Sequence, residues 1–236
     1  MSNATNPDDD HTHPTELRSF GRKRGRAPGP RQARLLSEAL PNAALDLTAP
    51  FAQSYPVTPP RLWLEIGFGG AEHLLWQAEH NRDVVLIGCE PFEGGVIKAL
   101  AGIEELGLTN LRLHADDARP LLRWLPEASV ERAFVLFPDP WPKKKHVKRR
   151  LVAKPLLDQL ARAMLPGGEL RVATDIGDYA RTILLSILPH SAFIWPARSA
   201  ADWRERSADW PQTRYEAKAI REGRARYYFR FQRRMP

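Results

Sequence analysis

Cysteine is nearly absent from this 236-residue sequence, in which Cys89 stands alone. One cysteine excludes an intramolecular disulfide and any zinc site built from several thiolates. The seven histidines show no metal-ligand spacing, and no apolar run approaches the roughly 20 residues that a membrane span requires. Residues 1–13 are polar and acidic, unlike a secretory signal peptide. We therefore expect a reduced, cytoplasmic protein with no metal and no membrane association.

The composition fits a globular protein with an anionic partner. Hydrophobic residues make up 43% of the chain and charged residues 27%, which is usual for a soluble domain. Lysine and arginine number 35 against 28 acidic residues, so the formal net charge is +7. Such an excess says little about the fold but favours binding to a polyanion.

The chain divides near residue 60. Seven basic residues and no acidic ones lie between Arg18 and Arg34, among glycines and prolines that break regular structure. This composition is typical of a disordered tail, and it also fits an arm that contacts nucleic acid. The sequence predicts a basic, partly disordered extension over residues 1–60, with a short helix over 32–40, and a folded domain over 61–236.

From Arg61 onward, short apolar segments alternate with helical ones. Strands are expected at 62–66, 84–89, 111–114, 132–137 and 169–173, and helices at 71–80, 92–106, 151–165 and 177–188, with a short helix ending at Trp124. Residues 166–168, Pro-Gly-Gly, are expected to turn the chain into the fifth strand. This alternation predicts an α/β fold, a mostly parallel sheet with helices on both faces. The aromatic segment 226–232 follows no clear crossover helix and is expected to pair antiparallel.

Acidic residues end three consecutive predicted strands. The turn after Glu65 is rich in glycine, but Glu72 stands where the dinucleotide fingerprint needs glycine or alanine. Glu90 fits an acceptor for two ribose hydroxyls or an exposed loop acid. Asp116 and Asp117 fit an acceptor for an adenine amino group or a helix cap. Because parallel strands bring these ends to one edge, the set indicates an adenosine-containing cofactor.

A second group of motifs fits recognition of a nucleobase and its phosphates. Asp139 lies between two prolines beside Trp141, a rigid arrangement that suits hydrogen bonding and stacking but also a plain turn. Residues 143–150 carry six fixed positive charges, which either bind phosphates or form a solvated face. Asp175 fits a helix cap, and residues 213–216, Thr-Arg-Tyr-Glu, fit a capping box.

These motifs resemble the bacterial tRNA (guanine-N7-)-methyltransferases. The most specific match is the unbroken string 137–150, and segments 64–69, 173–175 and 213–216 match in the same order. The resemblance runs from about Arg61 to the C-terminus, with a fainter echo at residues 18–20. The family often has a further glycine at the position of Ala71, whereas here the additional glycine is Gly70.

The resemblance implies a Rossmann-like class I methyltransferase fold, a seven-stranded, mostly parallel sheet in the order 3-2-1-4-5-7-6 with strand 7 antiparallel. It implies transfer of a methyl group from S-adenosyl-L-methionine to N7 of a guanosine in tRNA, at position 46 of the variable loop. Five residues are then expected to bind the cofactor: Glu65, Gly67, Gly69, Glu90 and Asp117.

The resemblance also assigns the substrate side. Asp139 is expected to be catalytic. The expected substrate-binding residues are Asp139, Lys143, Asp175, Thr213, Arg214, Tyr215 and Glu216, and the expected RNA contacts are Lys144, Lys145, Lys148, Arg149 and Arg150. Guanine N7 has an in-plane lone pair and needs no deprotonation, so we expect neither a Cys or Ser nucleophile nor an essential histidine. A monomer is expected rather than a homodimer.

Two other functions remain open on the sequence. One is methylation of an adenine or cytosine amino group, whose catalytic loop reads Asp/Asn-Pro-Pro-aromatic at this place on the sheet. Asp139-Pro140-Trp141 lacks the second proline. The other is a non-catalytic RNA-binding protein on the same fold.

Overall fold

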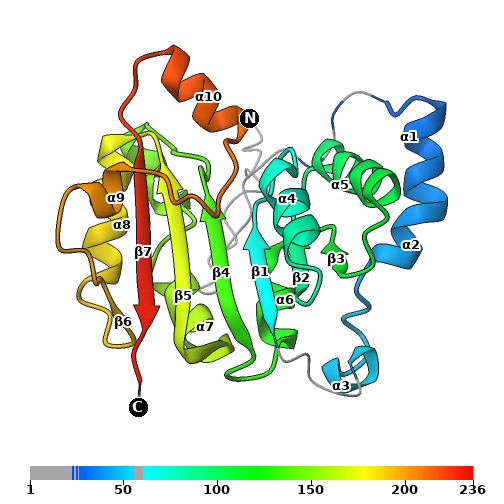
Figure 1. The fold of residues 1–236 in the computed structure, drawn as a ribbon, viewed down its shortest axis with the longest axis horizontal. Helices are drawn as coiled ribbons and strands as arrows, with labels where there is room; N and C mark the ends of the chain where they lie inside the picture. Colours follow the sequence, from blue (N-terminus) through cyan, green and yellow to red (C-terminus); the bar gives the residue numbers. More distant parts are fainter. Residues whose placement is uncertain (1–22, 24, 26, 56–60, 236) are drawn as a thin grey trace, which may run out of the picture.

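The computed structural model describes residues 23, 25, 27–55 and 61–235. Within them lies one sheet in the order β3-β2-β1-β4-β5-β7-β6 (Figure 1). Strand β7 is antiparallel to both of its neighbours, and the other neighbouring pairs are parallel. The structure thus confirms the strand order and the one reversed strand that the resemblance implies.

The elements follow one another in the alternating pattern that the sequence predicts. The strands are β1 Leu62–Ile66, β2 Val85–Cys89, β3 Leu111–His114, β4 Val130–Leu136, β5 Met164–Thr174, β6 Phe193–Ile194 and β7 Tyr227–Arg233. The helices of the domain are α4 Glu72–His80, α5 Glu93–Leu106, α6 Ala118–Trp124, the 3-10 helix η2 Lys144–Arg149, α7 Lys154–Ala163, α8 Gly177–Ile187, α9 Ala201–Arg204 and α10 Arg214–Arg221.

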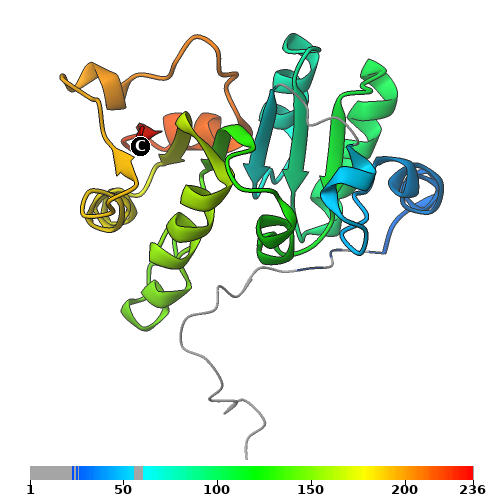
Figure 2. The ribbon, with the colours of Figure 1, turned by 90° about the horizontal axis from the view of Figure 1, so that it is seen from below.

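Strands β1, β2, β4, β5 and β7 send side chains into two separate cores on opposite faces of the sheet, whereas β3 contributes to one core only and β6 to the other only. On one face Trp63 and Leu86 pack with α4 and α5. On the other face Leu64 and Ile87 pack with α6, α7 and α8. Figure 2 views the sheet from below, with the helices of the two faces on opposite sides of it. Because both faces are covered in the middle of the sheet, β1 and β2 are largely apolar, whereas β3 and β7 alternate apolar with polar residues.

The described part of the N-terminal extension is folded. A helical stretch runs from Pro30 to Ala43 as α1 Pro30–Arg34, the π-helical turn η1 Leu35–Ala39 and α2 Leu40–Ala43, and α3 covers Phe51–Ser54. Leu35 and Phe51 are buried in the two cores of the sheet. The stretch is longer than the predicted helix over 32–40, because apolar residues such as Leu35 gain a surface to pack on. Residues 1–22, 24, 26 and 56–60 of the predicted extension lie outside the described residues, and the division of the chain at residue 60 stays a prediction.

One junction differs from the sequence-based expectation. Helix α7 starts at Lys154 and stops at Ala163, and β5 starts at Met164, which pairs with Val130. Residues 166–168 then form a bulge rather than a turn before the strand, and Glu169 pairs with Arg132. The apolar residues before the bulge fit a helix end and a buried strand equally well by pattern. The other predicted boundaries agree within two residues.

Candidate active site

Acidic side chains follow five adjacent strands at one edge of the sheet. They are Glu65 in β1, Glu90 after β2, Asp116 and Asp117 after β3, Asp139 after β4 and Asp175 after β5. Figure 1 shows this carboxyl edge at the top of the sheet, with α10 beside it. Ligands of open α/β sheets bind at this edge, so the acids form the candidate site.

The turn between β1 and α4 has three left-handed residues. They are Gly67 with φ 76°, Gly69 with φ 53° and Ala71 with φ 66°. A left-handed alanine is strained because its Cβ crowds the backbone. A glycine, which the bacterial tRNA (guanine-N7-)-methyltransferases often have at this position, avoids that strain. On the far side of the turn, a methyl group on Gly95 of α5 would collide with the Gly69 carbonyl. Glycine at 95 therefore lets α5 approach the turn.

Glu90 ties the end of β2 to this turn. Its two carboxylate oxygens accept hydrogen bonds from the backbone amides of Gly69 at 2.8 Å and Phe92 at 2.9 Å. Burial raises the pKa of Glu90, the two amide donors offset part of that rise, and the charges of Asp139 and Glu65 add to it. The predicted cofactor acid is thus a buried side chain that shapes the turn, not an exposed loop acid.

Glu65 is also buried, and its partner is a histidine that the sequence analysis did not identify. His73, in the first turns of α4, contacts Glu65 Oε2 through Nδ1 at 2.7 Å, and both side chains are 2% exposed. The eight-residue separation spans a turn and a helix start, so no motif spacing reveals this contact.

Asp117 caps a helix, as the sequence allowed. Its Oδ1 accepts the backbone amide of Arg119 at 2.9 Å and the Arg119 Nε at 2.6 Å, at the start of α6. Its neighbour Asp116 pairs with Lys23 at 2.8 Å, and this pair lowers the pKa of Asp116. The cap accounts for Asp117 in the fold, and its binding to an adenine group stays a prediction.

Asp139 is exposed on a strained loop. Phe137 and Trp141, which flank the Pro-Asp-Pro sequence, have φ values of 49° and 43°. Left-handed conformations of bulky residues cost of order 1–3 kcal/mol and cluster at functional sites. The loop is held from behind, where Arg150 Nε donates to the Pro140 carbonyl at 2.9 Å.

The expected RNA contact at Arg150 is wrong. Its guanidinium is buried, lies 4.9 Å from the Tyr179 ring centroid and bonds Pro140, Thr182 and Asp178. A guanidinium with its donors engaged inside the protein cannot neutralise an RNA phosphate. Arg150, the last residue of the basic run, therefore supports the Asp139 loop from the protein interior, through its bond to the Pro140 carbonyl.

The rest of the basic run lies at the surface. Lys143, Lys144, Lys145 and Lys148 are exposed, and Arg149 lies over the Trp141 ring at 5.1 Å. The run forms the 3-10 helix η2 with no acidic residue in its first turn. Four lysines therefore extend from the Asp139 loop toward solvent, where phosphates could reach them.

Asp175 does not cap a helix. Helix α8 starts after Ile176 with no side-chain cap, and Asp175 instead pairs with Arg224 at 2.7 Å. This correction has a simple cause: Arg224, just beyond α10, supplies a charged partner that competes with backbone amides. The pair joins β5 to the segment that carries Thr213–Glu216.

Half of the expected capping box forms. Thr213 Oγ1 accepts the Glu216 amide at 3.2 Å. The Glu216 carboxylate turns inward instead of returning to Thr213, and its Oε1 accepts from Tyr228 at 2.8 Å and Arg206 at 3.0 Å. Its buried Oε2 has no partner among the described residues. One buried carboxylate oxygen near the start of α10 thus has no hydrogen-bond donor among the described residues.

The start of α10 lies against the glycine turn. Arg214 pairs with Glu72 at the start of α4, and the Tyr215 ring lies 3.2 Å from where a Cβ on Gly69 would stand. Burial raises the pKa of Tyr215, with contributions from the charges of Glu90 and Asp139. The structure therefore brings together Glu90, Asp139, Tyr215 and the glycine turn, while Asp117 lies farther along the same edge.

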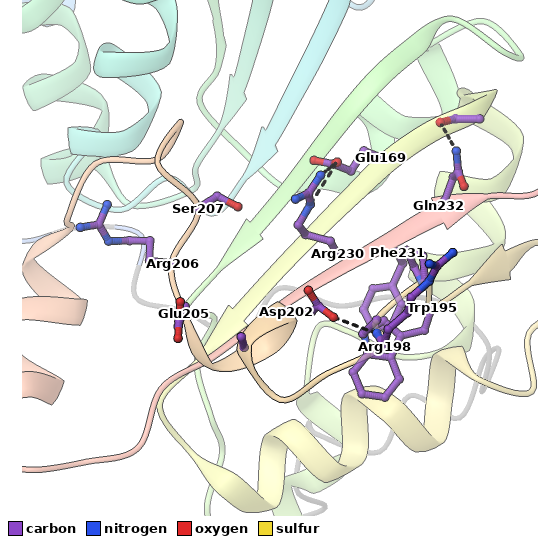
Figure 3. A pocket seen from close by; sticks show the side chains of 14 residues that line it. Glu169, Trp195, Arg198, Asp202, Glu205, Arg206, Ser207, Arg230, Phe231 and Gln232 are labelled. Atoms are coloured by element: carbon purple, nitrogen blue, oxygen red, sulfur yellow. Dashed lines mark hydrogen bonds and ion pairs between the residues drawn. The ribbon is translucent and has the colours of Figure 1, made fainter.

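A cavity of about 580 Å³ lies elsewhere, beside β7 (Figure 3). It is lined by the start of β5, the end of β7 and loop 195–207, and Glu169 there pairs with Arg230 at 2.9 Å. These residues lie toward the amino ends of the parallel strands. The cavity is therefore separate from the six acids. The described residues contain no cluster suited to a metal ion and no helix that could span a membrane.

Comparisons with known proteins agree with this geometry. A family model described as a putative methyltransferase matches residues 60–229. A tRNA (guanine-N(7)-)-methyltransferase of Rhodospirillum rubrum is 47% identical over 230 residues, covering 94% of this chain and 90% of that protein. A protein of the same name from Jannaschia sp. is 44% identical, covering 96% and 98%.

Solved structures support the fold alone. The 16S rRNA methyltransferase KamB superposes with a TM-score of 0.56 at 16% identity, over 78% of this chain and 92% of that one. An antibiotic-related methyltransferase gives a TM-score of 0.52 at 16% identity, over 81% and 95%. The sheet described above is thus that of class I methyltransferases.

Proposed function

Since this chain belongs to the tRNA (guanine-N(7)-)-methyltransferase family, we propose that it methylates N7 of the variable-loop guanosine at tRNA position 46, with S-adenosyl-L-methionine as donor. The membership confirms the resemblance that the motifs indicate. The position in the tRNA, the donor and the roles of single residues are the proposal. The observation that supports the donor and the residue roles is that Glu90, bonded to the Gly69 amide at 2.8 Å, and Tyr215, whose ring lies against Gly69, share one edge of the sheet with the Asp139 loop after β4.

The carboxyl edge fits a zwitterionic adenosine cofactor. Each oxygen of Glu90 accepts one amide and keeps lone pairs for a ribose hydroxyl. A Cβ on Gly67 would meet nothing within 4 Å, so a ligand can lie against the backbone there. The carboxylates of Glu65 and Asp139 favour the positive amino and sulfonium groups. We assign cofactor binding to the same five residues, Glu65, Gly67, Gly69, Glu90 and Asp117.

The chemistry requires alignment more than proton transfer. S-adenosyl-L-methionine supplies an electrophilic methyl group on a sulfonium. Guanine N7 presents a lone pair without deprotonation, so the protein gains most by holding the base in line. Asp139 stabilises the positive charge that develops on the methylated base. Lys143, Asp175 and residues 213–216 hold the nucleotide.

Transfer of a labelled methyl group to bulk tRNA, followed by nucleoside analysis, tests the function. The expected product is 7-methylguanosine at position 46. A methylated amino group of adenine or cytosine would indicate the alternative reaction, and binding without transfer would indicate a non-catalytic RNA-binding protein.

Cofactor affinity is expected to depend on Glu90 and on pH. The carboxylate accepts from both ribose hydroxyls only when ionised, and its pKa is raised by burial. Affinity is therefore highest above that pKa and weakens as the pH falls through it, towards the level of a variant that lacks the charge. Calorimetric Kd values for S-adenosyl-L-methionine, from the ordinary glutamate range at about pH 4 up to about pH 8, measure the effect.

The Glu90→Gln variant supplies the control. It keeps the shape of the side chain but removes the titration, so its Kd should not follow this pH step. At neutral pH its binding should be weaker by about 2 kcal/mol, the scale of a hydrogen bond to a charged group. A wild-type Kd that stays constant over the range would exclude this role of Glu90.

The exposed lysines of η2 are expected to set the salt dependence of tRNA binding. Replacing Lys144, Lys145 and Lys148 with alanine removes three charges that face solvent. Each phosphate contact contributes about −0.7 to −0.9 to the slope of log affinity against log salt, so the slope should become shallower by about 2 to 3. Titrations at three salt concentrations measure it.

Arg123, an exposed basic residue in the last turn of α6, gives a control at the opposite edge of the sheet. Arg123→Ala should leave the slope unchanged. Equal slopes for the wild type and the triple variant would mean that the lysines are solvated surface charges that do not contact tRNA phosphates.

A further inference from the structure

Helix α4 contains a buried histidine that the proposed reaction does not use. His73 is 2% exposed, and its ring packs edge-on against Phe134 at 4.7 Å and Trp210 at 5.6 Å between centroids. Its Nδ1 lies 2.7 Å from Glu65 Oε2. We propose that His73 is a positioning residue that orients the Glu65 carboxylate for the cofactor. The inference rests on the proposed role of Glu65 in cofactor binding.

The hydrogen bonds of α4 decide which His73 nitrogen carries the proton. Asn81 Nδ2 donates to Gln77 Oε1 at 3.2 Å, which directs the Gln77 amide nitrogen the other way. That nitrogen donates to the Asp209 carbonyl at 2.8 Å and lies 3.1 Å from His73 Nε2. An amide nitrogen can only donate, so His73 Nε2 accepts. His73 is therefore a neutral ring with its proton on Nδ1, which donates to Glu65.

This donor fixes a side chain that could otherwise rotate. One oxygen of Glu65 is occupied by His73, and no described group donates to the other. The second oxygen is then held in one direction for a ligand. The arrangement parallels the way in which partners outside a metal site orient its ligands, where loss of the partner weakens binding without touching the ligand.

The same hydrogen bonds reach the segment before α10. The Asp209 carboxylate accepts two bonds from the buried Arg171, at 2.9 and 2.7 Å, and Trp210 packs on the His73 ring. Thr213, the cap of α10, follows three residues after Trp210. His73 and Gln77 thus join the cofactor acid to the anchored loop that positions the proposed substrate segment. No essential histidine was expected from the sequence, and His73 acts here without transferring a proton.

Calorimetry with S-adenosyl-L-methionine tests the proposal on binding rather than on turnover. His73→Phe keeps the ring but removes the donor, and it should raise the Kd about tenfold. An asparagine places an amide nitrogen near the position of Nδ1, whereas a glutamine places it near Nε2. His73→Asn should therefore bind within about threefold of wild type, and His73→Gln should resemble His73→Phe. His80, stacked on Trp76 in the same helix, supplies the control variant His80→Phe.

A double-mutant cycle tests whether His73 affects cofactor binding through Glu65. In a Glu65→Gln background, His73→Phe should raise the Kd no further, because the two changes interrupt one interaction. Additive losses of affinity would overturn the proposed action of His73 through Glu65. Equal Kd values for His73→Asn and His73→Gln would overturn it too, and that comparison can be made even if His73→Phe fails to fold. If Glu65→Gln alone leaves the Kd unchanged, the proposed cofactor role of Glu65 fails, and the inference fails with it.

Discussion

Replacing Asp139 with asparagine is expected to lower the turnover number by about 100-fold or more, while the Kd for S-adenosyl-L-methionine stays within about twofold. The asparagine keeps the shape of the side chain and removes the charge that favours the methylated, positively charged base. The loop should persist, because its conformation depends on the flanking residues and on Arg150, not on a bond made by Asp139. Single-turnover kinetics with tRNA and calorimetry with the cofactor measure the two quantities.

Asp83 provides a matched acid for comparison. It is exposed at the amino end of β2, where it pairs with Arg61 at 2.8 Å. Asp83→Asn should leave turnover unchanged, so a general effect of lost negative charge can be separated from the effect at Asp139. Near-wild-type turnover in both Asp139→Asn and Asp139→Ala would show that the loop has only a structural role.

Removing the Arg150 guanidinium is expected to have the second largest effect. Arg150→Met leaves an aliphatic chain of similar length but withdraws the donor from the Pro140 carbonyl and the partner from Asp178. The left-handed residues of the loop then lose their support, so turnover should fall about 100-fold through misplacement of Asp139. The free energy of unfolding should fall by about 2 to 3 kcal/mol, as for a buried, hydrogen-bonded charge.

Salt titrations distinguish Arg150 from the lysines beside it. The slope of tRNA affinity against salt should be unchanged in Arg150→Met, because this guanidinium faces the protein interior. Lys148→Met should show the opposite pattern, a shallower slope with a stable fold. A shallower slope in Arg150→Met, with stability intact, would restore the assignment of Arg150 to the RNA surface.

Periodicity along the chain predicted the sheet well, because its central strands β1 and β2 are apolar runs buried on both faces and bounded by turn residues. The junction between α7 and β5 was missed for a physical reason. Met164 and Leu165 are apolar in a way that suits either a helix end or a strand, and only the partner Val130 decides. The folding of residues 30–55 was predicted only in part: the helix expected over 32–40 lies within the observed stretch Pro30–Ala43, but α1 has no buried residue that would indicate its start, and α3 was not expected.

The candidate site, too, could be predicted only in part from the sequence. Acids at strand ends could be placed on one edge from topology alone, because parallel strands share a direction. Contacts between side chains on different elements could not be predicted in this way. The pair of His73 with Glu65 and that of Arg224 with Asp175 join residues whose spacing carries no pattern. Arg150 shows the limit most clearly, since charge alone cannot tell a buried donor from its exposed neighbours in one run.

The position of β7 constrains the order in which the polypeptide can fold during translation. Strand β6 reaches the sheet through β7, which is made later and inserts between β5 and β6. While the ribosome has yet to deliver residues 227–233, the hydrogen-bonding groups of Glu169–Thr174 face an open side of β5. An open, apolar strand edge is a template for aggregation. A nascent chain of this protein is therefore expected to need protection, by a chaperone or by the ribosome surface, until that strand emerges.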